Sequence, residues 1–244
     1  MELFDLREPV SAWSHATWLL MSLPATWYLW RRSVGDRPKR LSLLVFGLSL
    51  AFCAAASTLY HGARLSAKWI AEFDRIDHIG IFMLIAGSYT PMAWSLLRGR
   101  WRWGTLSLAW LLTLAGTTML LAFGVLSSFW CTALYLGMGW GALACYFELA
   151  RRLTHRAIFP LLLGGIFYSV GAVLNLAGWP VLRRGVVGPH EIFHLFVIAG
   201  SLSHFWFMVR VVVPATPARQ ATPGPALGAG HCLPIPLRVS PRSE

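Results

Sequence analysis

Charged side chains are scarce in this sequence. Asp, Glu, Lys and Arg make up 13% of its 244 residues, whereas hydrophobic residues make up 56%. Soluble domains carry about 25% charged residues. A chain of this size with so little polar side chain cannot coat a soluble globule, which excludes an ordinary cytosolic enzyme. The composition instead predicts an integral membrane protein.

Cysteine is also scarce, with four widely spaced residues and no Cys-x-x-Cys pair: Cys53, Cys131, Cys145 and Cys232. Three of them lie in apolar stretches, which favours buried free thiols over a disulfide framework or a cysteine metal cluster. A signal peptide opens with basic residues, whereas the start of this chain is acidic at Glu2, Asp5 and Glu8 and has one basic residue, Arg7. We therefore expect no cleavable signal peptide.

Long apolar runs are abundant. A bilayer core about 30 Å thick requires roughly 20 apolar helical residues, and five segments qualify: residues 11–30, 41–60, 76–97, 157–176 and 190–213. A further 45 residues, 103–147, contain no charged side chain. At about 1.5 Å per residue this stretch is too long for one crossing. We expect two helices here that turn near residues 124–128.

Backbone inside a bilayer must hydrogen-bond to itself, and the runs are uniformly apolar rather than alternating, so they predict α-helices and not a β-barrel. The sequence thus predicts an all-α membrane protein with a seven-helix transmembrane domain over residues 1–213. The last 31 residues, 214–244, hold seven of the 14 prolines. We interpret them as a disordered tail.

Basic residues are distributed unevenly between the two ends of the predicted bundle. With seven spans, six Lys and Arg residues fall on the side of the N-terminus and 15 on the opposite side. The positive-inside rule then places the N-terminus outside and the tail in the cytoplasm. The net charge of +11 therefore reports orientation, and we expect membrane lipid rather than nucleic acid as the partner.

Five polar residues lie within or beside the apolar runs: Ser57, His61, Asp77, His190 and His194. Ionisable residues at such positions are costly and are functional candidates. His190 and His194 are four residues apart, so they share one helix face and can aim their imidazoles at one point, as a helical metal site requires. Two histidines at this spacing also occur by chance or as hydrogen-bonding residues.

The predicted topology brings the five residues to one face of the membrane. His61 ends the second span, Asp77 opens the third and His190 opens the seventh. Three imidazoles with a fourth position open are typical of catalytic zinc, which makes hydroxide available near neutral pH. Asp77 could serve as a general base or hold a ligand histidine. Ser57 could bind a substrate oxyanion, or could equally be a helix-packing residue.

Three other histidines have simpler interpretations. His15 begins the first span, where an interfacial role is favoured over a contact with the metal site. His78 lies about 100° around the helix from Asp77, so both cannot face one centre, and we interpret it as a packing residue. His204 lies about 15 Å from His194 along the helix, which makes it a packing or proton-path residue rather than a ligand.

Several motifs together resemble the hemolysin III branch of the progestin and adipoQ receptor family. They occupy residues 57–61, 76–80, 84–91, 190–194 and 200–205. The resemblance implies seven helices in a bacterial plasma membrane and a Zn²⁺ ion bound by His61, His190 and His194. It also implies that Asp77 lies near the ion and that Ser57 belongs to the same cluster.

Relatives in this broader family include adiponectin receptors and alkaline ceramidases, so the resemblance implies hydrolysis of a lipid amide or ester. The hemolysin name suggests a membrane-perturbing or pore-forming protein instead. A pore would need polar residues repeated along a helix face, and the spans show little of this. A third hypothesis is a sensor in which the metal organises the helices and a partner reads their arrangement.

Overall fold

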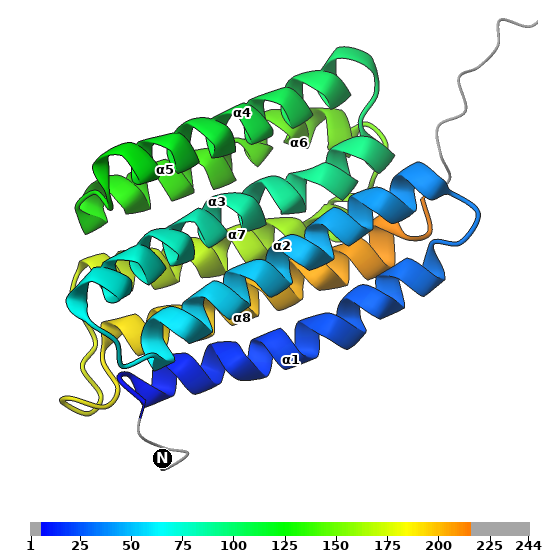
Figure 1. The fold of residues 1–244 in the computed structure, drawn as a ribbon. Helices are drawn as coiled ribbons and strands as arrows, with labels where there is room; N and C mark the ends of the chain where they lie inside the picture. Colours follow the sequence, from blue (N-terminus) through cyan, green and yellow to red (C-terminus); the bar gives the residue numbers. More distant parts are fainter. Residues whose placement is uncertain (1–5, 216–244) are drawn as a thin grey trace, which may run out of the picture.

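The computed structural model describes residues 6–215, which form α-helices running side by side in one bundle (Figure 1). In chain order the helices are α1 (Pro9–Arg32), α2 (Arg37–Gly62), α3 (Ala67–Leu96), α4 (Gly99–Phe123), α5 (Ser128–Trp140), α6 (Ala142–Ala150), α7 (His155–Leu176), α8 (Pro189–Phe207) and a short π-helical segment η1 (Met208–Val212). Within residues 6–215 the only β-pairing is one isolated bridge, between Arg183 and Val187. The all-α prediction is confirmed. The predicted tail, from residue 216 on, lies outside the described residues.

Five helices are long and apolar enough to cross a membrane: α2, α3, α4, α7, and α8 continued by η1. Helix α1 has 24 residues, but its Trp, Ser, Thr and His residues lower its mean hydropathy. Helices α5 and α6 have 13 and nine residues, and each is short for a crossing. The five long helices agree with an integral membrane protein.

The turn predicted near residues 124–128 is confirmed. Helix α4 ends at Phe123, and Gly124 adopts a left-handed φ of 83°, a conformation that glycine adopts without steric cost. A second interruption, at Gly141 between α5 and α6, was not predicted. The Tyr89 hydroxyl is placed to donate to the carbonyls of Met138 and Gly139 just before it, at 2.8 and 3.0 Å. The tyrosine comes from α3, so hydropathy along α5 and α6 does not reveal this contact.

Helix α3 begins at Ala67, nine residues before the predicted start at residue 76. The additional turns carry charged residues, which are compatible with a helix that continues beyond the apolar run. An ion pair between Arg75 and Glu72 at 2.9 Å supports them. Asp77 therefore lies well inside a helix rather than at its first turn, although it still faces the predicted site.

The packing brings one end of each of four helices together. Helix α2 packs against α1 and α3, and α8 packs against α7 and α1. Small residues allow this close approach: a Cβ on Gly171 of α7 would lie 2.5 Å from the Cβ of Phe196 on α8. The end of α2 and the beginnings of α1, α3 and α8 meet at the same end of the bundle (Figure 1). All of the predicted site residues come from these helices.

Candidate metal centre

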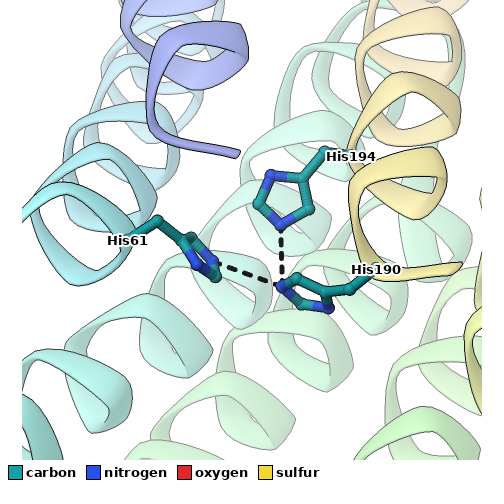
Figure 2. Close-up of side chains that lie close together, drawn as sticks. All are labelled: His61, His190 and His194. Atoms are coloured by element: carbon teal, nitrogen blue, oxygen red, sulfur yellow. Dashed lines mark hydrogen bonds between the residues drawn. The ribbon is translucent and has the colours of Figure 1, made fainter. Parts of the chain in front are cut away.

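Three histidine side chains converge at this end of the bundle. His61 is the second-last residue of α2, while His190 and His194 lie in the first two turns of α8. The Nε2 atom of His190 is 3.3 Å from Nε2 of His61 and 3.0 Å from Nε2 of His194 (Figure 2). His61 and His194 are almost fully buried, with 1% and 3% of their surface exposed. The sequence interval of 129 residues between His61 and His190 is thus closed by helix packing.

The spacing of the three nitrogens fits a shared metal ion. Their ligand atoms all lie within 4.8 Å of one another, and the group could hold a metal. Two nitrogens bound tetrahedrally at about 2.0–2.1 Å from zinc would be about 3.3–3.4 Å apart. The observed separations of 3.0 and 3.3 Å are close to that value. A set of imidazole nitrogens suits zinc, copper, iron or nickel.

Glu8 holds the first of these histidines in place. Its Oε2 atom lies 2.5 Å from Nδ1 of His61. The backbone supports this position, because the Glu8 amide donates to the His61 carbonyl at 2.9 Å. Partial burial raises the pKa of the Glu8 carboxyl, and the Arg7 guanidinium opposes that shift. With Nδ1–H of His61 donated to Glu8, the lone pair of Nε2 faces the other two histidines, as in the carboxylate–histidine pairs of metal sites.

His15 holds His194 in place in a similar way. The two Nδ1 atoms are 2.8 Å apart, and the ring centroids are 4.2 Å apart. His15 is 4% exposed, so its interpretation as an interfacial residue was wrong. The physical reason is that α1 packs against the start of α8, which turns His15 inward rather than toward the membrane surface. If Nδ1–H of His194 is donated to His15, then Nε2 of His194 is also left for a metal.

Asp77 and Ser57 complete the predicted group. The Oδ2 atom of Asp77 is 3.8 Å from Nε2 of His61. Ser57 is buried, and its side chain interacts with the Asp77 carboxyl group. The structure therefore brings all five sequence-predicted residues together along the wall of one cavity.

His78 and His204 stay apart from this group. His78 Nδ1 contacts the backbone carbonyl of Asp74 at 2.9 Å and its carboxylate at 3.3 Å. His204 lies deeper in the bundle, where Nε2 donates to the Leu161 carbonyl at 3.2 Å and the ring meets Tyr168. Neither histidine belongs to the three-nitrogen group, in agreement with the sequence analysis.

The cavity beside the histidines has a volume of about 800 Å³. It extends from Glu8 and His61 at one end of the bundle to Leu149 and Ile158 near the other. Leucine, isoleucine and aromatic side chains from α3, α5, α7 and α8 make up much of its wall. An elongated apolar space with polar groups concentrated at one end suits an amphipathic molecule.

The contact between Glu8 and His61 predicts a measurable effect on metal affinity. Glu8→Gln keeps the size of the side chain but removes the carboxylate that orients His61. We expect metal affinity to fall about 10–100-fold, as is typical when the partner of a ligand is lost. Competition with a chromophoric chelator measures this. Glu72→Gln is the matched control, since Glu72 pairs with Arg75. Equal affinities in the two variants would contradict the assignment.

The chain is similar to proteins of one known family. The family model described as "Haemolysin-III related" matches residues 5–205. The chain is similar to Hemolysin-3 of Bacillus cereus, with 32% identity over 216 residues that cover 88% of this chain and 95% of the relative. It is also similar to a Hemolysin-3 homolog of Bacillus subtilis (strain 168), with 32% identity over 84% of this chain and 94% of the relative. The matched region includes the whole histidine cluster, four of the five long apolar helices and most of the fifth, so the chain belongs to the haemolysin III family of integral membrane proteins.

Proposed function

We propose that this protein is a zinc-dependent hydrolase of a lipid amide or ester. The observation that carries the proposal is the convergence of three Nε2 atoms beside the Asp77 carboxylate at one end of an elongated apolar cavity. The three histidines supply three neutral nitrogen ligands, and three protein ligands with one position open are typical of catalytic rather than structural zinc. Such an ion supplies Lewis acidity and activates water for attack on a carbonyl carbon.

The side chains around the ion have separate roles in this proposal. Asp77 accepts a proton from the attacking water and passes it to the nitrogen or oxygen of the leaving group as the C–N or C–O bond breaks. Ser57 contacts Asp77 and either positions its carboxylate or donates a hydrogen bond to the developing oxyanion. Glu8 and His15 hold two of the ligand rings in the required tautomer.

The cavity supports a substrate with a long apolar chain. Its volume of about 800 Å³ lies within the range of about 300–1,000 Å³ that is typical of small-molecule sites. A chain that enters the apolar part leaves the polar head of the lipid at the end where the histidines lie. In this proposal the bond between acyl chain and head group then lies near Asp77 and Ser57.

We further propose seven membrane crossings. Helix α1, with 24 residues, is about 36 Å long. Helices α5 and α6 together extend from Ser128 to Ala150, about 34 Å. Both lengths exceed a bilayer core of about 30 Å.

The excess of basic residues, 15 against six, favours an outside N-terminus and metal centre. A reporter that is active only in the cytoplasm, fused after residue 244, should be active, and an inactive reporter would refute this orientation.

The hydrolase proposal is tested on the purified wild-type protein. Elemental analysis should find one zinc ion per chain. Mass spectrometry should detect free fatty acid and its amine or alcohol partner when the protein is mixed with a panel of lipid amides and esters. A wild-type protein that holds no metal would exclude the proposal. Zinc without turnover across the panel would favour a metal-stabilised sensor.

The name of the Bacillus cereus relative, Hemolysin-3, suggests a second candidate, a membrane-permeabilising protein. Liposomes loaded with a fluorescent dye separate the two. Dye leakage of equal extent with wild-type protein and His61→Ala would favour permeabilisation. Lipid hydrolysis without leakage would favour the enzyme.

A further inference from the structure

A second cluster of reactive side chains lies outside the metal centre. Cys131 is the fourth residue of α5, and His78 and Asp74 lie one turn apart on α3. The Cys131 thiol contacts the His78 imidazole. Nδ1 of His78 in turn lies 3.3 Å from Oδ1 of Asp74 and 2.9 Å from the Asp74 carbonyl. A thiol, an imidazole and a carboxylate thus follow one another in space.

This order is the one that activates a nucleophile. An imidazole in contact with a thiol can take its proton, and a carboxylate on the other nitrogen holds the ring in the required tautomer. The Cys131 thiol donates a hydrogen bond to the Leu126 carbonyl at 3.6 Å, and it gives up this contact when its proton passes to His78.

The surroundings of the thiol point to an acyl group as the ligand. Cys131, His78 and Asp74 all line the same elongated apolar cavity as the metal centre. Tyr135, one turn after Cys131, contacts the thiol, and its hydroxyl lies 3.5 Å from the His78 carbonyl. That hydroxyl is placed to donate a hydrogen bond to an oxyanion that forms next to Sγ.

We propose that Cys131 is a nucleophile that accepts a long-chain acyl group from an acyl thioester, with His78 as its base and Asp74 as a positioning residue. Sγ attacks the thioester carbonyl carbon and forms a new C–S bond while the bond to the donor sulfur breaks. The thiol proton passes through His78 to the departing thiolate. One thioester is exchanged for another, so the step needs no oxidant or energy source. The metal centre takes no part in it.

The other buried cysteines provide matched controls. Cys53 lines the same cavity, but it packs in the apolar core against Gly80. Cys145 is buried beside the Thr105 hydroxyl, 3.3 Å away. Neither thiol has the arrangement of imidazole and carboxylate that Cys131 has. Among residues 6–215, Cys53, Cys131 and Cys145 are all free thiols.

The experiment uses the full chain in detergent micelles with a palmitoyl thioester that carries a terminal alkyne. Peptide mass spectrometry should place one hydroxylamine-labile acyl group on Cys131. Cys131→Ser should abolish the label, whereas Cys53→Ser and Cys145→Ser should leave it unchanged. His78→Gln should slow acylation about 100-fold or more, since general-base catalysis typically contributes about 10²–10⁴. Asp74→Asn should slow acylation less, since it alters the orientation of the base only.

A measurement on the wild-type protein alone guards against variants that do not fold. The cavity predicts that a palmitoyl thioester acylates Cys131 at least tenfold faster than an acetyl thioester does. Equal rates for the two donors would overturn the proposal. Equal labelling of Cys53 and Cys131, a wild-type rate in folded His78→Gln, or no acylation of the wild type would overturn it as well. Since no step requires zinc or a lipid amide, these results are independent of the proposed hydrolase activity.

Discussion

His190→Ala should deprive the protein of its metal ion. His190 Nε2 lies between the other two ligand atoms, at 3.3 Å from His61 and 3.0 Å from His194. Its loss leaves two protein ligands where a catalytic site needs three. We expect affinity to fall by more than 100-fold, beyond the effect of losing Glu8, because a direct ligand is removed rather than its partner. Elemental analysis after dialysis, together with chelator competition, measures both occupancy and affinity.

His155→Ala is the control for this substitution. His155 begins α7 at the opposite end of the bundle and contacts the Tyr146 hydroxyl at 2.7 Å. The variant should keep one metal ion per chain. Equimolar metal in His190→Ala, at wild-type affinity, would show that the three histidines form a hydrogen-bonded group instead of a metal centre.

Asp77→Asn should separate metal binding from catalysis. The carboxylate lies 3.8 Å from the His61 nitrogen, near enough to act on a water at the centre. It is not one of the three proposed metal ligands, which are all imidazoles. The amide has the same shape but cannot accept the proton. We expect kcat to fall about 10²–10⁴-fold with one metal ion still bound and KM little changed. Steady-state kinetics on the lipid that is turned over, combined with elemental analysis, measure these quantities.

The matched control is Asp36→Asn. Asp36 caps α2 at the opposite end of the bundle, where its carboxylate accepts a hydrogen bond from the Lys39 amide at 3.1 Å. Asparagine caps helices about as well as aspartate does, so activity should stay at the wild-type level. A wild-type kcat in Asp77→Asn would remove Asp77 from the proposed mechanism.

Much of the fold and part of the site can be predicted from patterns within single segments of the sequence. The scarcity of charge predicts the membrane, and runs of about 20 apolar residues predict helices. The uncharged stretch of 45 residues predicts a turn, which the structure places between α4 and α5. The interval of four residues between His190 and His194 predicts a shared helix face. In each case the physical cause acts within one helix or between one helix and the bilayer.

The early start of α3 and the interruption at Gly141 are harder to predict from the sequence. Hydropathy reports where a helix meets lipid and says little of the charged turns from Ala67 onward, which lie beyond the apolar run. Just before the interruption at Gly141, the Met138 and Gly139 carbonyls accept a hydrogen bond from the Tyr89 hydroxyl of α3. No pattern within α5 and α6 contains that partner.

The sequence by itself determined that this protein is a helical membrane protein and which polar residues are candidates for a metal site. Only the tertiary structure decided which side chains contact them: Glu8 contacts His61, and His15 contacts His194. It also decided the contact between Cys131 and His78, outside the metal site. The first two contacts span 53 and 179 residues of sequence. They depend on which helices pack together and on how each is rotated about its axis. A hydropathy pattern constrains that rotation only loosely, because most faces of these helices are apolar.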